Sequence, residues 1–75
     1  MSILEDLADQ LARDALILER DLDDSLIEEV AKVIGASSQT LEEAYLTAIR
    51  VRRAEMRGRA VLEARAAEDG KSLDE

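Results

Sequence analysis

The sequence contains no cysteine, histidine, proline, tryptophan or phenylalanine, and Tyr45 is its only aromatic residue. Without cysteine there is no disulfide, and without cysteine or histidine there is no zinc site of the usual thiolate and imidazole type. The usual general bases and thiol nucleophiles are therefore missing, and the three glycines are too scattered to form a phosphate-binding loop. We expect no enzyme activity, no cofactor and no bound metal.

Long apolar runs are also absent. None approaches the roughly 20 residues that cross a bilayer, and the first residues carry acids where a signal peptide would carry basic residues. These features predict a cytoplasmic protein that does not enter the membrane. The chain has 75 residues, and a core of such a small protein rarely supplies more than about 3–5 kcal/mol of stability. Because disulfides are excluded, the remaining source of stability is association of the chain with itself or with a partner.

Charge is distributed unevenly along the chain. The formal net charge is −8, but residues 1–43 hold twelve acidic and three basic residues, whereas residues 44–75 hold seven basic and six acidic ones. This asymmetry favours charge complementarity between subunits or toward a partner. The alternative interpretation is that these charges only keep solvated helix faces soluble.

Helical periodicity predicts an all-α, three-helix chain. A long helix should run from about Ser2 to Leu22, a short one from Ser25 to Ile34, and a long C-terminal one from Thr40 to Glu68. These helices form a single helical domain over residues 1–68, and residues 69–75 are expected to be a flexible acidic tail.

Serines precede each predicted helix, namely Ser2, Ser25 and either Ser37 or Ser38. Their side-chain oxygens can accept hydrogen bonds from the free N–H groups of the first helical turn. We expect Gly35 to end the short helix in a left-handed conformation, which glycine adopts more easily than other residues.

The apolar positions of the three helices predict one core. Its expected members are Leu4, Leu11, Leu18, Leu22, Leu26, Val30, Leu41, Tyr45 and Ile49.

The C-terminal helix changes character after Ile49. Four residues of alternating charge follow at helical spacing on the same side: Arg52, Glu55, Arg59 and Glu63. This pattern predicts a ladder of ion pairs on a helix that projects from the body of the protein or pairs with a partner.

Leu16 and Ile17 lie off the main apolar stripe of the first helix, on opposite sides of it. A helix that is apolar on more than one face needs more than one neighbour. We therefore expect a non-catalytic protein–protein interaction module, such as a regulator, an adaptor or a chaperone-like binder. It should bind a protein partner or self-associate as a helical dimer. The expected contact residues are Leu16, Ile17, Arg50, Arg52, Arg53, Arg57 and Arg59.

From Glu29 to Ile49 the chain resembles the helix–turn–helix unit of phage-type repressors. The resemblance rests on the small Ala31 in the first helix, Gly35 in the turn and the apolar Leu41 in the second helix. It implies DNA binding, in which bases or phosphates of the major groove would face Ser37, Ser38, Gln39 and Glu42. Electrostatics disfavours nucleic acid, because phosphates are normally neutralised by lysine and arginine.

Two further alternatives follow from the acidic half. The opening Met1-Ser2-Ile3-Leu4-Glu5-Asp6-Leu7 resembles the small acidic co-chaperones of bacterial secretion systems, which shield an amphipathic helix of a partner. An acidic inhibitor that mimics nucleic acid would instead occupy a basic groove of its target, using Asp21, Asp23 and Asp24.

Overall fold

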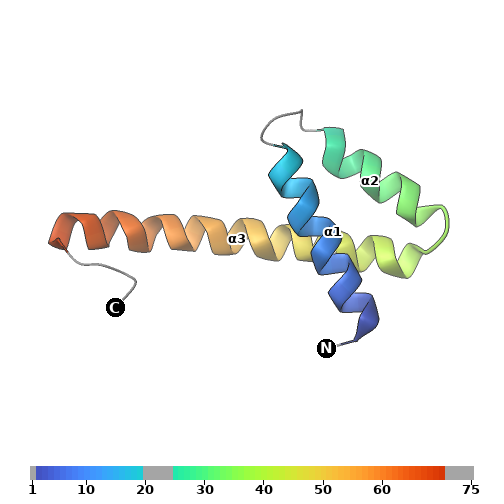
Figure 1. Cartoon of the computed structure of the whole chain (residues 1–75), viewed down its shortest axis with the longest axis horizontal. Coiled ribbons are helices and arrows are strands. Elements are labelled where there is room, and N and C mark those ends of the chain that lie inside the picture. Colours follow the sequence, from blue (N-terminus) through green and yellow to red (C-terminus); the bar gives the residue numbers. More distant parts are fainter. Residues whose placement is uncertain (1, 20–24, 71–75) are drawn as a thin grey trace.

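The computed structural model describes residues 2–19 and 25–70, and these ranges contain three α-helices and no strand. The helices are α1 (Ile3–Glu19), α2 (Ser25–Gly35) and α3 (Gln39–Asp69), as Figure 1 shows. The predicted all-α class and the order of a long, a short and a long helix are confirmed. None of the three described helices is both long and apolar enough to cross a membrane.

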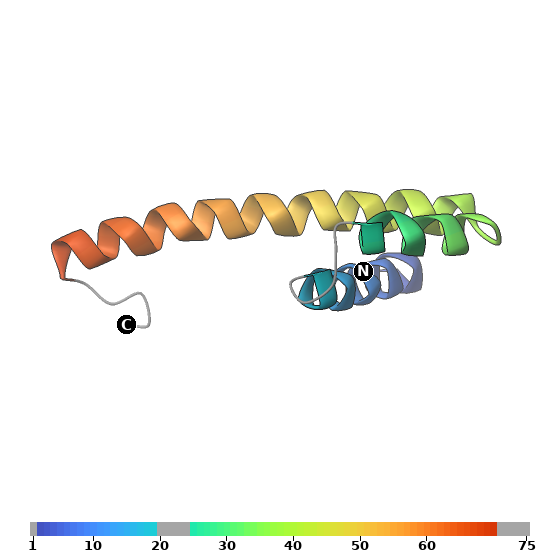
Figure 2. The ribbon, with the colours of Figure 1, turned by 90° about the horizontal axis from the view of Figure 1, so that it is seen from above.

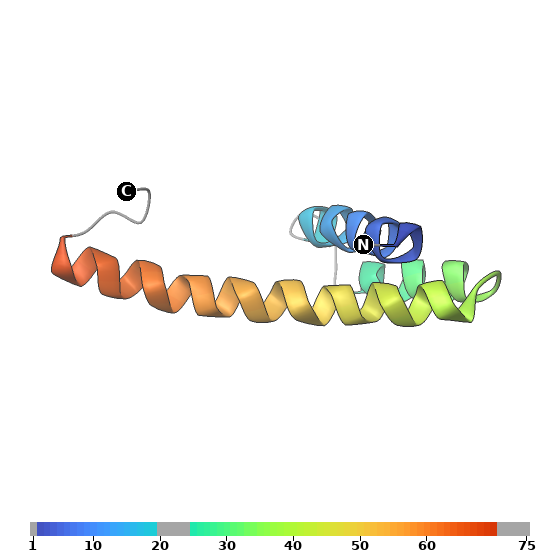
Figure 3. The same ribbon diagram turned by 90° about the horizontal axis from the view of Figure 1, so that it is seen from below.

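α1 crosses one face of α3 and α2 lies beside it, and both cover only the N-terminal half of α3 (Figure 2 and Figure 3). The 31 residues of α3 correspond to about 46 Å of helix, and the molecule measures 49 Å along its longest axis. The radius of gyration is 15.3 Å, against about 11 Å for a compact chain of this length. The C-terminal half of α3 therefore projects from the body, as its charge pattern predicts.

Serine caps begin α1 and α3. The Ser2 hydroxyl accepts a hydrogen bond from the Glu5 N–H at 3.1 Å, and the Ser38 hydroxyl accepts one from the Leu41 N–H at 3.0 Å. Capping by these two serines is confirmed. At its other end, α3 stops at Gly70, whose N–H bonds back to the last turn of the helix.

Gly35 is the last residue of α2, and its expected left-handed conformation is wrong. Among the described residues only Gly70 has a positive φ, at 69°. Gly35 instead lies close to a side chain of the next helix. A Cβ at this position would lie 2.8 Å from the Cδ atom of Glu42 and still closer to its carboxylate oxygen. Because these atoms are the end of the flexible Glu42 side chain, that side chain would have to move if a larger residue replaced Gly35.

The core consists largely of alanine. Its buried members are Ala8, Ala12, Ala15, Ile27, Ala31, Tyr45 and Ile49. The distance between packed helices depends on the side chains at their contact. The alanine face of α1 therefore lets this helix lie close to its neighbours.

Tyr45 is the largest fully buried side chain of the core. Its hydroxyl donates a hydrogen bond to the Ile27 carbonyl at 3.1 Å, which joins α3 to α2. Burial raises the pKa of Tyr45 above its ordinary value, because the charged phenolate would lose its hydration.

The predicted core is right for Tyr45 and Ile49 and wrong for Leu18 of α1. Leu18 is exposed, because α1 turns its alanine face toward the core. Leu22 and the predicted end of the first helix lie outside the described residues, as do residues 71–75 of the predicted tail. Several predicted core residues are only partly buried, namely Leu4, Leu11, Leu26, Val30 and Leu41.

Candidate partner-binding site

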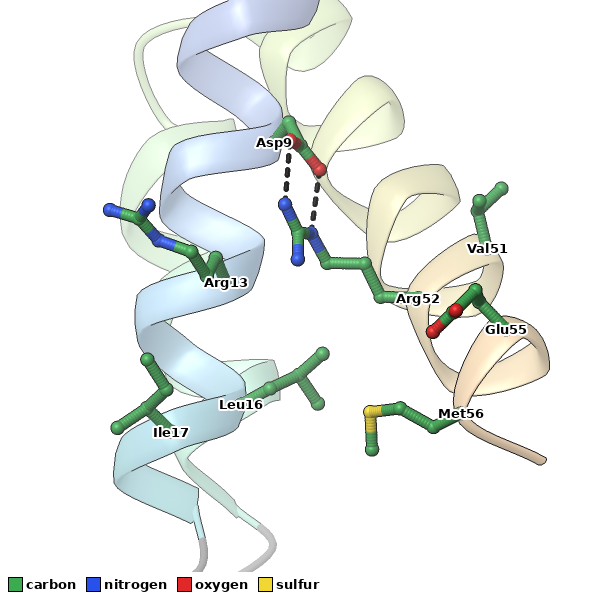
Figure 4. Close-up of a pocket in the computed structure, with 8 residues that line it drawn as sticks. All are labelled: Asp9, Arg13, Leu16, Ile17, Val51, Arg52, Glu55 and Met56. Carbon is green, nitrogen blue, oxygen red and sulfur yellow. Dashed lines mark hydrogen bonds and ion pairs between the residues drawn. The ribbon is translucent and has the colours of Figure 1, made fainter. Parts of the chain in front are cut away.

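A groove of about 420 Å³ opens where α1 crosses α3. Figure 4 shows Leu16 of α1 and Met56 of α3 pointing toward each other across it. Its other lining residues are Asp9, Arg13, Ile17, Val51, Arg52 and Glu55. Ile17, Val51 and Met56 are all exposed, so the groove presents apolar side chains between charged ones.

A second groove, of about 370 Å³, continues the first toward the N-terminal end of α3. The two share Asp9 of α1 and Val51 of α3. The remaining lining residues of the second groove are Glu5, Ala8, Ala44, Thr47 and Ala48. We call the combined feature the α1–α3 trough. Its lining residues on α3 extend from Ala44 to Met56, and α1, which crosses α3, supplies the others.

A two-pronged ion pair bridges the trough at its middle. The Nε and Nη2 atoms of Arg52 each donate to one carboxylate oxygen of Asp9, and both distances are 2.7 Å. Planar arginine matches a carboxylate in this geometry, which fixes direction as well as distance. The hydrogen bonds from Arg52 hold the pKa of Asp9 below its usual value. They also raise the pKa of Arg52.

This ion pair predicts a pH-dependent contribution to stability. Because the pKa of Asp9 is lower in the folded state, the contribution is present above its unfolded value of about 3.9 and is lost as the pH falls through the folded value. We expect Asp9→Asn to lower the melting temperature at pH 7 and to melt like the native chain near pH 2. Thermal denaturation followed by circular dichroism measures both temperatures.

The control for this experiment is Asp14→Asn on the same helix. Asp14 is exposed and contacts only its neighbour Arg13, at 3.4 Å, among the described residues. Exposed pairs of this kind contribute little, so this variant should melt like the native chain at pH 7. If Asp9→Asn lowered the melting temperature equally at both pH values, the pH-dependent stability would not come from the Asp9–Arg52 ion pair.

The trough brings together three of the predicted contact residues: Leu16, Ile17 and Arg52. The predicted pairing of Arg52 within an ion-pair ladder is wrong, because Arg52 binds Asp9 of α1. Another part of the ladder forms, since Arg59 contacts Glu55 one turn away at 3.3 Å.

The other predicted arginines lie elsewhere on α3. Arg50 and Arg53 line a separate groove toward α2, where Arg53 contacts Glu19 at 2.7 Å. Arg57 is exposed and has no ion pair within the described ranges. The predicted arginines therefore do not form a single contact surface.

Residues suggested by the helix–turn–helix resemblance lie at the α2–α3 corner. Ser37 and Gln39 are exposed, while the Ser38 hydroxyl is engaged as the cap of α3. The Glu42 carboxylate lies over Gly35. The acidic residues of the nucleic-acid mimic, Asp21, Asp23 and Asp24, lie outside the described ranges.

Sequence reasoning missed several residues of the trough, chiefly Asp9 and Val51. Asp9 pairs with a residue 43 positions away, and no periodic pattern connects two such positions. Val51 lies on the side of α3 away from its apolar stripe, so it gave no core signal.

Comparison of the chain with protein-family models, curated proteins and solved structures finds no match.

Proposed function

We propose that this protein is a non-catalytic interaction module that binds an α-helix of a protein partner in the α1–α3 trough. The observation that carries the proposal is the set of exposed apolar side chains that line the trough, Ile17, Val51 and Met56. Apolar side chains gathered on a surface and surrounded by polar groups typically mark a protein interaction site. The small alanine core, which leaves these side chains uncovered, supports the same proposal.

A helix is the partner element that best fits this shape. The lining of the trough extends along α3 from Ala44 to Met56, which corresponds to about 20 Å or between three and four helical turns. An amphipathic helix lays its apolar face into such a groove with anchors three or four residues apart. Arg13 and Glu55 give the margin charges of both signs, which suit the polar rim of an interface.

Adjacent residues of α1 provide a matched test. Ile17 is 56% exposed and lines the trough, whereas Leu18 is 50% exposed and does not. We expect Ile17→Lys to abolish retention of a partner when the tagged chain is purified from its native cells. Leu18→Lys should retain that partner as the native chain does. Circular dichroism should show the same helix content for all three proteins.

Equal retention by Ile17→Lys and by the native chain would contradict the proposal.

Titration with duplex DNA at low salt tests the alternative function. Affinity that falls steeply with salt and weakens in Gln39→Ala would favour the helix–turn–helix interpretation. We favour the trough because its apolar side chains are exposed. The Ser38 hydroxyl, which would face DNA in the alternative, already caps α3.

A further inference from the structure

We infer that the helix received by the trough is the C-terminal arm of α3 from a second copy of this chain. We define the arm as residues 57–69. Two copies would lie antiparallel about a two-fold axis, and each arm would fill the trough of the other. This inference rests on the proposed function and names the partner of the same site.

The trough and the arm have the same length. The trough follows thirteen residues of α3, from Ala44 to Met56, and the arm that comes next also has thirteen. Both segments therefore measure about 20 Å. A two-fold axis at Arg57 places residues 58–69 of each arm over residues 45–56 of the other copy, which is nearly the whole trough. Such an interface is self-complementary and closed, which is the usual way in which identical chains pair.

The arm carries an apolar residue on the side that faces the trough. Val51, Glu55, Gly58 and Leu62 follow one another at steps of four, three and four, so they share one side of α3. Leu62 is exposed within its own chain. In the antiparallel arrangement it reaches the level of Arg52 in the second copy, beside Val51, which lies on the same side of α3 as Leu62. Val51 of the second copy then covers Leu62.

Charges on the arm and on the trough are complementary in this arrangement. Glu55 of one copy comes beside Arg59 of the other, and the two-fold axis repeats this contact. Glu63 has no ion pair within the described ranges, and it comes beside Arg13 at the trough margin. Opposite charges across an interface fix its register. Glu5, at the far end of the trough, lies near the acidic last turn of the arm. Because like charges repel, this turn contributes least to the stability of the dimer.

Gly58 allows the α3 helices of the two copies to approach each other closely. It lies one residue from the axis, and a Cβ at this position would meet no atom of its own chain within 4 Å. The space beside it is therefore open for the second copy. Arg57 lies on the opposite side of α3, so the two copies of this arginine do not face each other.

Sedimentation of the purified full chain tests the inference. We expect a mass of twice 8.3 kDa at micromolar concentration. Leu62→Lys should weaken the dimer at least about tenfold, because a buried leucine is replaced by a charge. The matched control is Val61→Lys on the neighbouring position, which is also exposed but points away from the trough. This variant should dimerise like the native chain.

Cysteine cross-linking tests the direction and register, because the native chain has no cysteine. The proposed pairing places Ala48 of one copy opposite Ala66 of the other. A mixture of Ala48→Cys and Ala66→Cys should yield a disulfide-linked heterodimer on oxidation, while each variant alone should remain uncross-linked. Ala60→Cys mixed with Ala48→Cys is the control and should not cross-link, because Ala60 lies on another side of α3.

Each outcome decides the inference. A monomeric native chain overturns it, while the comparison of Ile17→Lys with Leu18→Lys still tests the docking function separately. A dimer that Leu62→Lys leaves intact, or cross-links within single variants, overturns the arrangement. A dimer weakened by Leu62→Lys and cross-linked only in the mixture of Ala48→Cys and Ala66→Cys supports it.

Discussion

Tyr45→Ala is expected to leave the chain largely unfolded at 25 °C. Tyr45 is fully buried and is the largest side chain of the core. Removal of a large buried aromatic ring costs about 3–5 kcal/mol, which equals the whole stability that a core of this size supplies, about 3–5 kcal/mol. Circular dichroism at 222 nm should therefore show a large loss of helix. The loss should be greatest at low protein concentration, where association contributes least.

Tyr45→Phe is the matched control for this prediction. It keeps the ring and removes only the hydrogen bond to the Ile27 carbonyl. We expect a loss of about 1 kcal/mol, which lowers the melting temperature by about 4–8 °C in a domain of this length. A Tyr45→Ala protein that melts within a few degrees of Tyr45→Phe would show that the ring does not hold the core together.

Ala12→Leu is expected to displace α1 from α3. Ala12 is fully buried, and its small side chain leaves no room for the added carbon atoms of leucine. Overpacking of this kind costs about 1–3 kcal/mol, which is a large share of the stability of so small a core. We expect the melting temperature to fall by roughly 10 °C. The Asp9–Arg52 ion pair should weaken as well, because it joins the same two helices.

The control for Ala12→Leu is Ala64→Leu on the exposed arm. Leucine and alanine have similar helix propensity, and position 64 lies outside both the core and the proposed dimer contact. This variant should melt within about 1–2 °C of the native chain. Equal effects of the two substitutions would mean that the alanine face of α1 is not tightly packed.

Local features of the chain were sufficient to predict the three helices. Ser2 and Ser38 cap α1 and α3, and each capping interaction involves residues only three positions apart. The projecting arm was also predictable, since a helix whose apolar stripe gives way to charges has nothing to bury. Such features depend on neighbours along the helix, so one sequence contains enough information to place them.

Packing between helices decided the rest. Leucines and alanines share one apolar side of α1, and periodicity alone does not decide which of them lie closest to the neighbouring helices. The structure buries Ala8, Ala12 and Ala15, which exposes Leu18 and brings Asp9 to Arg52. The α1–α3 trough exists because of this choice. Periodicity identifies the apolar sides of a helix, but which side meets a neighbour depends on how closely the backbones approach, and that is a property of the assembled core.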